Sequence, residues 1–121
     1  MAVINLQEAL NAATLAAHKA APILQHYAQH RKELTIDFKQ HNDLVSQADR
    51  EAEQAIIQTL KKATPHFGIV GEESGGHAEG PAFWVIDPLD GTTNFLHGLP
   101  FYVISIALVA KKGQRLNTGI T

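Results

Sequence analysis

The chain is organised around one stretch, Trp84-Val85-Ile86-Asp87-Pro88-Leu89-Asp90-Gly91-Thr92-Thr93-Asn94-Phe95. Together with Phe83, its first three residues form a run of aromatic and β-branched side chains, which predicts a strand. The strand leads directly into two aspartates separated by a Pro-Leu pair. Asp-Pro and Asp-Gly steps are typical of turns, so we expect a turn here. A helical turn is expected next, around Thr93 to His97.

A second acidic group follows another short strand upstream. The run Phe67-Gly68-Ile69-Val70 predicts a strand, and Gly71-Glu72-Glu73-Ser74 comes directly after it. Side chains at the ends of neighbouring strands meet at one edge of a sheet, where carboxylates can share space only if cations or protons relieve their repulsion. Hard oxygen ligands favour Mg²⁺ or Mn²⁺ over Zn²⁺. Four carboxylates are expected to converge in this way: those of Glu72, Glu73, Asp87 and Asp90.

A purely structural explanation of Asp87 and Asp90 stays open. Asp-Pro and Asp-Gly are common turn formers, and Asp87 and Asp90 could each hydrogen-bond their own backbone. The sequel Thr92-Thr93-Asn94 favours function, because it supplies hydroxyl and backbone N–H groups at the start of a helical turn. Such places bind phosphate.

The N-terminal part predicts a helix, a strand and a second helix. Apolar residues in steps of three and four predict the first helix from Asn5 to His30, with a kink near Pro22. Alternating polarity predicts a strand from Leu34 to Lys39. A capping-box-like Ser46-Gln47-Ala48-Asp49 predicts the start of the second helix, which should end at Lys61-Lys62 before Thr64-Pro65. The expected inner faces are Leu10, Ala13, Ala17, Ala20, Leu24 and Tyr27 for the first helix and Ala48, Ala52, Ala55, Ile56 and Leu60 for the second.

The C-terminal part predicts strands at Tyr102 to Ala110 and Leu116 to Thr121, joined by a turn at Lys111-Lys112-Gly113. The order of elements, helix, strand, helix and then mostly strands, predicts an α/β fold of the layered α+β kind. Two helices should pack on one face of a mainly antiparallel sheet.

Composition narrows the class of protein. The 121 residues are 45% hydrophobic and 18% charged, as in a globular unit. Ten Lys and Arg against 12 Asp and Glu give a net charge of -2 without a basic run, so no nucleic-acid partner is predicted. There is no Cys and no secretory signal, and the apolar run from Tyr102 to Ala110 is too short to span a membrane. We therefore expect a cytoplasmic protein. The seven His are scattered, without metal-ligand spacing.

The motifs resemble those of a known family. The stretch from Trp84 to Phe95 resembles the first signature of the inositol monophosphatases, and Gly71-Glu72-Glu73-Ser74 matches that family's upstream acidic motif. Lys39 and the segment from Asp43 to Asp49 occupy the matching earlier places. The family belongs to the Mg²⁺-dependent, lithium-sensitive phosphatase superfamily, with the fold shared by inositol monophosphatase and fructose-bisphosphatase. Fructose-bisphosphatase relatives favour Ser-Ser where this chain has Thr92-Thr93, which selects the inositol monophosphatase branch.

The resemblance implies a phosphomonoesterase that hydrolyses myo-inositol 1-phosphate to myo-inositol and phosphate by metal-activated water. Two or three Mg²⁺ ions are expected in the complete enzyme, with Mn²⁺ as a substitute, and the complete form is expected to be a homodimer. The implied metal ligands are Glu72, Asp87, the backbone carbonyl of Leu89, and Asp90. The implied substrate-binding residues are Asp90, Gly91, Thr92 and Thr93.

The resemblance also implies catalytic roles for Asp49, Thr92, Glu73 and Lys39. Asp49 and Thr92 would form a hydrogen-bonded pair that positions or deprotonates the attacking water, while Glu73 would orient waters nearby. Simpler explanations exist for two of these residues. Asp49 is also explained as a helix N-terminal residue favoured by the dipole, and a strand-end Lys39 is usually solvated.

The resemblance implies that residues 1–121 form a single partial domain, the N-terminal half of the family's fold. The family's second signature contains a Trp-Asp pair that supplies a further ligand, but the one Trp here is Trp84, followed by Val85. One alternative is therefore a non-catalytic fragment that binds metal or a partner. Another is a phosphatase of a different small phosphomonoester, such as a sugar phosphate or a nucleotide 3′-phosphate.

Overall fold

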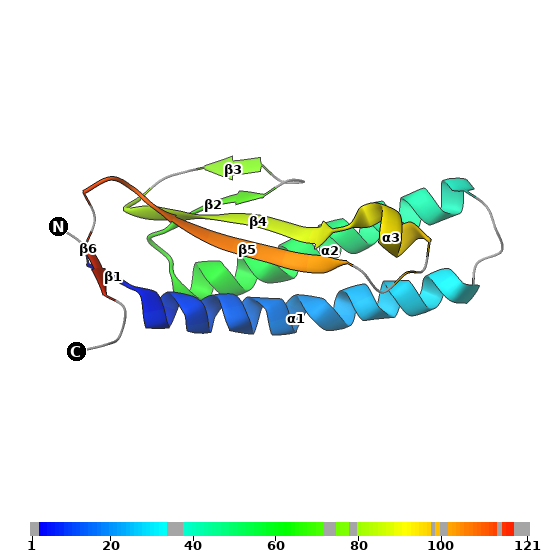
Figure 1. Cartoon of the computed structure of the whole chain (residues 1–121), viewed down its shortest axis with the longest axis horizontal. Coiled ribbons are helices and arrows are strands. Elements are labelled where there is room, and N and C mark those ends of the chain that lie inside the picture. The colour runs from blue at the N-terminus through cyan, green and yellow to red at the C-terminus, as the bar shows by residue number, and fades with distance from the viewer. Residues whose placement is uncertain are drawn as a thin grey trace.

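Two long helices lie side by side along a four-stranded sheet in the computed structural model (Figure 1). The structure describes residues 3–33, 38–71, 75–77, 80–97, 99, 102–113 and 115–117. Its elements are β1 (Val3–Asn5), α1 (Leu6–Glu33), α2 (Phe38–Ala63), β2 (Gly68–Gly71), β3 (Gly75–His77), β4 (Ala82–Asp90), α3 (Thr92–Leu96), β5 (Val103–Ala110) and β6 (Arg115–Asn117). The predicted layered α/β fold is confirmed.

The main sheet has the strand order β3-β2-β4-β5. β2 pairs in parallel with β4, whereas β2 with β3 and β4 with β5 are antiparallel. The sheet is therefore mixed, with more antiparallel than parallel pairing among the described strands. β3 lies between β2 and β4, where no strand was predicted. β1 was also not predicted, and it pairs in parallel with β6 in a separate sheet at one end of the molecule (Figure 1).

Helix α1 is continuous across Pro22 and extends beyond the predicted end at His30 to Glu33. The predicted inner face is wrong in its first half, since Leu10 is 60% exposed. The same steps of three and four apply, but they are shifted by one residue there. Small alanines form most of the buried face of α1. Their size lets α1 and α2 approach closely. The buried residues of α1 are Ala9, Ala12, Ala16, Ala20, Leu24 and Tyr27, with Ala13 and Ala17 half-buried.

Helix α2 begins at Phe38, well before the predicted start at Ser46. The predicted strand from Leu34 to Lys39 is wrong at its end, since Phe38 and Lys39 belong to the helix, and the rest of it lies outside the described residues. A short alternating pattern is weak evidence for a strand. The helical spacing of buried apolar residues in α2 begins before Ser46, because Val45 is already buried. The capping explanation of Asp49 is therefore wrong, because Asp49 lies in the helix interior.

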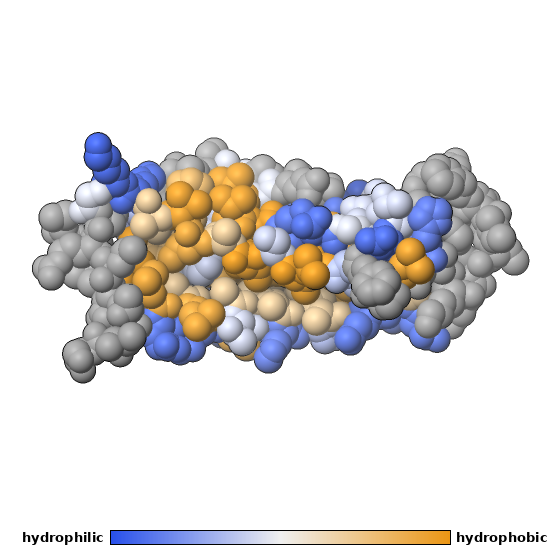
Figure 2. All heavy atoms as spheres, in the orientation of Figure 1, coloured by the Kyte–Doolittle hydropathy of each residue, from blue (hydrophilic) through white to orange (hydrophobic). Residues whose placement is uncertain are grey.

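The core lies between the two helices and the sheet. Ala48, Ala52, Ile56 and Leu60 are buried as predicted, and Ala55 is half-buried. They face β4 residues Trp84 and Ile86, which are also buried. The alternate residues of the sheet lie on its other face, where Val85, Val103 and Val109 are exposed. Figure 2 shows hydrophobic atoms gathered over β4 and β5. None of the described helices is long and apolar enough to cross a membrane.

The end of α2 is tied to β4 by buried hydrogen bonds. Helix α2 ends at Ala63, as the Lys61-Lys62 and Thr64-Pro65 pattern predicts. The Thr64 hydroxyl donates to the Leu60 carbonyl at 2.8 Å and accepts from Nε1 of Trp84 at 3.0 Å. Because the Trp84 side chain is buried, its N–H depends on Thr64 for an acceptor.

We predict that Thr64→Val lowers the free energy of unfolding by about 1–3 kcal/mol, because it leaves the buried Trp84 N–H without an acceptor. Urea unfolding followed by tryptophan fluorescence measures the change. Thr59→Val is the matched control, since the Thr59 hydroxyl likewise donates to a carbonyl one turn back, that of Ala55, at 2.9 Å. Equal effects of the two substitutions would contradict a special role for the Trp84 bond.

Tyr27 links α1 to α2. Burial raises the pKa of the Tyr27 phenol above its ordinary value, and the hydrogen bond that it donates to the Glu51 carboxylate adds to the rise, as does the charge of Glu51. A raised folded-state pKa means that folding favours the neutral phenol. The stability from this contact is fully present below the unfolded-state pKa and is lost as the pH rises through the folded-state pKa.

We predict that Tyr27→Phe lowers the melting temperature near neutral pH and that this difference shrinks above about pH 10, where the phenol begins to ionise. Thermal unfolding of both proteins across this range tests the prediction. Tyr102→Phe controls for general alkaline effects. A difference that stayed constant with pH would show that ionisation of Tyr27 does not couple to folding.

Candidate functional site

Asp87 and Asp90 lie at the end of β4, where the pairing with β5 is irregular. Asp87 lies opposite Ser105 and Asp90 opposite Val103, so the register shifts between the two aspartates. Three steps along β4 correspond to two along β5, which is the arrangement of a β-bulge. No local sequence pattern predicts this extra residue.

The bulge brings the two aspartates to the same face of the sheet. Residues three apart in a regular strand lie on opposite faces. Ser105 and Val103 are two apart and share a face, and antiparallel partners also share a face, so Asp87 and Asp90 lie together. This is the face away from the helices, because the preceding residue, Ile86, is buried in the core.

The predicted turn at the two aspartates is wrong, because β4 continues through Asp90 and the segment from Asp87 to Asp90 is a bulged strand end. This segment, called the aspartate turn below, is held by its own hydrogen bonds. The Leu89 backbone N–H donates to Oδ1 of Asp87 at 3.2 Å, and the Thr92 hydroxyl donates to the Leu89 carbonyl at 3.4 Å. The side chains of Pro88 and Leu89 are buried beneath the turn. The structural explanation of Asp87 is therefore confirmed. It does not exclude function, because the bond uses one oxygen of the carboxylate and fixes the orientation of the group.

The expected helical turn is confirmed as α3. Gly91 precedes it with φ 93° and ψ 38°, a left-handed conformation that costs other residues about 1–2 kcal/mol. Phe95 anchors α3, since it is buried and its ring packs edge-on against Tyr102 at 5.0 Å between centroids. Thr92 and Thr93 are exposed beside this anchored turn, so their hydroxyls can reach a ligand from solvent.

The described residues include only part of the predicted site. Glu72 and Glu73 lie outside them, so convergence of the four carboxylates is tested only for Asp87 and Asp90. Lys39 lies in the first turn of α2. Asp49 is 8% exposed, and the predicted Asp49–Thr92 pair stays a prediction, with the Thr92 hydroxyl here directed to Leu89. Within the described part of the chain, no three His, Cys, Asp or Glu side chains form a group that could hold a metal ion.

Glu53 was missed by the sequence interpretation. It is 1% exposed and lies one helical turn after Asp49. A Cβ atom at Gly71 would lie only 2.7 Å from its Oε1. A signal was available, because Glu53 falls among the inner-face positions Ala52 and Ile56 of α2, where a charged residue is unusual.

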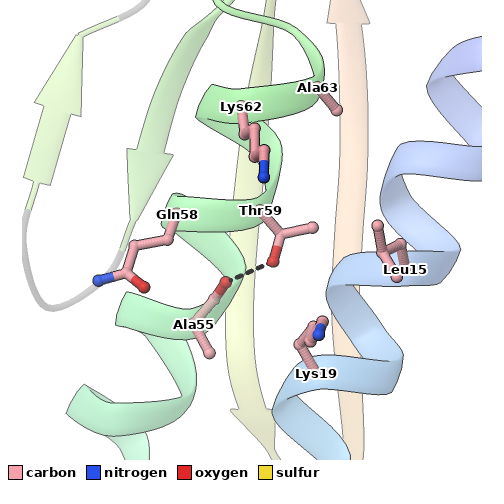
Figure 3. A pocket seen from close by; sticks show the side chains of 7 residues that line it. All are labelled: Leu15, Lys19, Ala55, Gln58, Thr59, Lys62 and Ala63. Atoms are coloured by element: carbon pink, nitrogen blue, oxygen red, sulfur yellow. Dashed lines mark hydrogen bonds between the residues drawn. The ribbon is translucent and has the colours of Figure 1, made fainter.

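A hollow of about 640 Å³ lies elsewhere, between α1 and α2. Figure 3 shows lysines from both helices at its rim, Lys19 and Lys62, and the Thr59 hydroxyl bonded to the Ala55 carbonyl. Its lining has no carboxylate, so it does not offer the ligands that a hard cation needs. The residues lining it are Leu15, Lys19, Ala55, Gln58, Thr59, Lys62 and Ala63.

A layered α/β fold in which one strand ends at two aspartates, with exposed hydroxyls on the following helical turn, is the arrangement that the family resemblance implies. The sequence profile of the inositol monophosphatase family matches residues 5–117, which is nearly the whole chain. This chain belongs to the inositol monophosphatase family. The resemblance inferred from the motifs is confirmed.

Individual relatives carry two kinds of name. The chain is 45% identical over 108 residues to the inositol-1-monophosphatase of Mesorhizobium japonicum, covering 87% of this chain and 40% of that protein. It is 43% identical over 106 residues to the Nus factor SuhB of Pseudomonas aeruginosa, covering 84% and 39%. The crystal structure of the extragenic suppressor protein SuhB from Bartonella henselae matches with a TM-score of 0.70 at 41% identity, covering 84% and 39%. The chain thus spans about 40% of the length of the curated relatives it matches.

Proposed function

We propose that this chain carries part of the active site of a Mg²⁺-dependent phosphomonoesterase that hydrolyses inositol monophosphates. One observation carries the proposal: a bulge in β4 brings Asp87 and Asp90 to one face of the sheet, in a chain of the inositol monophosphatase family. Membership of the family supports phosphatase activity, and inositol monophosphate as the substrate is the part that goes beyond it. Residues 1–121 would be a partial domain that contributes most of the ligands.

The donor set of the turn fits a hard cation. Asp87, Asp90 and the Leu89 carbonyl offer only oxygen, which Mg²⁺ and Mn²⁺ prefer. The Leu89 carbonyl accepts one hydrogen bond from Thr92, and a carbonyl oxygen has a second lone pair. Glu72 is proposed as a further ligand from the family motif. When bound, Mg²⁺ would supply a nucleophilic water near neutral pH and stabilise negative charge on the phosphoryl oxygens.

The chain's own residues would then bind and orient the substrate. Thr92 and Thr93 are exposed, so their hydroxyls could bind phosphate oxygens together with the backbone N–H of Gly91. Asp49 would accept a proton through Thr92, which requires the Thr92 hydroxyl to rotate away from Leu89. Glu73 and Lys39 would orient the attacking water.

We predict that Asp87→Asn weakens Mn²⁺ binding by more than about tenfold, since even residues behind a metal ligand change affinity by that much. The amide keeps an oxygen for the Leu89 N–H, so the turn should stay intact. Titration calorimetry measures the affinity, and Glu8→Gln, an exposed residue of α1, controls for the lost charge. Equal affinity in the wild type and Asp87→Asn would remove Asp87 from the site.

We predict that Thr92→Ala or Asp49→Asn, in the enzyme completed with its C-terminal half, lowers kcat about 100-fold with little change in KM. Each change would disturb the attacking water rather than substrate binding. Phosphate release from inositol 1-phosphate at saturating Mg²⁺ measures the rate, and melting temperatures are compared in parallel. Activity that fell only in step with loss of folded protein would reject the catalytic role.

A second candidate function comes from the relatives named Nus factor SuhB. The Pseudomonas aeruginosa protein matches this chain almost as closely as the Mesorhizobium japonicum phosphatase does, at 43% against 45% identity. One variant distinguishes the two functions. If the protein acts as a Nus factor, Asp87→Asn protein that has lost Mn²⁺ affinity should still replace the Nus factor in a strain that lacks it. Failure of both wild type and variant to do so would reject this candidate. Homodimer formation and a cytoplasmic location stay predictions.

A further inference from the structure

Glu53 is a buried carboxylate that the mechanism above does not use. Its side chain is 1% exposed and lies within the apolar face of α2. Taking a carboxylate out of water is costly unless other groups bind it, and Glu53 does interact with its surroundings. An apolar side chain would pack at this position without that cost. The charge therefore calls for an explanation in terms of what it contacts.

The carboxylate of Glu53 lies against the backbone of Gly71. A Cβ atom added at Gly71 would lie 2.7 Å from Oε1, 2.8 Å from Cδ and 3.1 Å from Oε2. The whole carboxylate group thus occupies the space that a side chain at residue 71 would need. Gly71 is itself buried. Only glycine allows α2 to bring a carboxylate this close to β2.

The contact lies where the two acidic motifs begin. Gly71 is the last residue of β2, and in the parallel pairing of β2 with β4 it lies in register with Ile86. Glu72 follows Gly71, and Asp87 follows Ile86. Glu53 therefore lies against the strand end from which one motif starts, directly beside the strand that leads into the other.

We propose that Glu53 is a positioning residue for the metal site. Its carboxylate fixes the end of β2 and thereby sets where the segment that starts at Glu72 begins relative to Asp87. This inference rests on the proposed function, because it takes Glu72 and Asp87 as metal ligands. Glu53 is enclosed between α2 and the β2 backbone, so it acts through Gly71 and is not itself a ligand.

The contact is tested by a double-mutant cycle on thermal stability. Gly71→Ala should lower the melting temperature, since its Cβ would collide with the carboxylate. In the Glu53→Ala background the same change should be tolerated, because the new methyl group enters the space that the carboxylate leaves. The double variant should then be more stable than the sum of the single effects. Additive effects would overturn the contact as a constraint on β2.

The positioning role is tested by Mn²⁺ affinity in the purified protein. Glu53→Gln keeps the size of the side chain and removes its charge, and we expect about tenfold weaker binding with a melting temperature near that of the wild type. The Glu53→Ala/Gly71→Ala double variant should regain stability and still bind weakly. Glu51→Gln, an exposed residue on the same helix, is the control and should bind like the wild type.

Different results would reject the positioning role of Glu53 and the proposed metal site. Wild-type Mn²⁺ affinity in Glu53→Gln, or in the Glu53→Ala/Gly71→Ala double variant, would overturn the positioning role while leaving the metal site intact. Equal Mn²⁺ affinity in the wild type and Asp87→Asn would overturn the proposed metal site, and the role of Glu53 with it.

Discussion

The register of β4 is the constraint on which the rest of the structure depends. β4 pairs with β2 on one side and β5 on the other, and its Trp84 and Ile86 fill the core beneath the helices. A slip by one residue would exchange its faces and expose both side chains, so the register is strongly specified. The bulge lies beyond Ile86, the last residue of β4 for which the described part of the chain gives a partner on β2. There it turns Asp87 and Asp90 to one face without disturbing the core.

Helix α2 places carboxylates against the same end of the sheet from the other side. Its alanines at positions 48 and 52 let it lie close to its neighbours, and that closeness buries Asp49 and Glu53. Buried charges rarely increase stability relative to apolar residues of the same size. Two of them lie on successive turns of α2, and Glu53 lies against Gly71 at the end of β2. Their burial is consistent with the site proposed above. Thr64 and Trp84 hold the opposite end of α2 to β4, so the position of the helix along the strand is fixed.

The sequence predicted those features that local chemistry decides. The strand that leads into Asp87 follows from its aromatic and β-branched residues, and the helical turn after Gly91 and the end of α2 before Thr64 follow from turn and terminating residues. All three are confirmed. Features decided by tertiary packing were missed. The start of α2 at Phe38 and the exposure of Leu10 depend on how the helices pack, and the pairing of β1 with β6 joins distant parts of the chain. The bulge in β4 arises from pairing with β5 and has no local signal. The position of Glu53 on the inner face of α2 could be predicted from the sequence, but its contact with Gly71 could not.

The face that carries the aspartates also carries the exposed apolar residues of the sheet. Val85 precedes Asp87 by two residues on β4, and Val103 lies opposite Asp90 on β5, with exposed fractions of 40% and 58%. Apolar neighbours supply neither counter-charge nor hydrogen bonds, and they limit how many waters can solvate a carboxylate. Repulsion between Asp87 and Asp90 is therefore screened less than it would be on a polar surface, and it rises if anything covers this face. If the proposed cation binds here, the same reduced screening would strengthen its attraction to both carboxylates and relieve their repulsion.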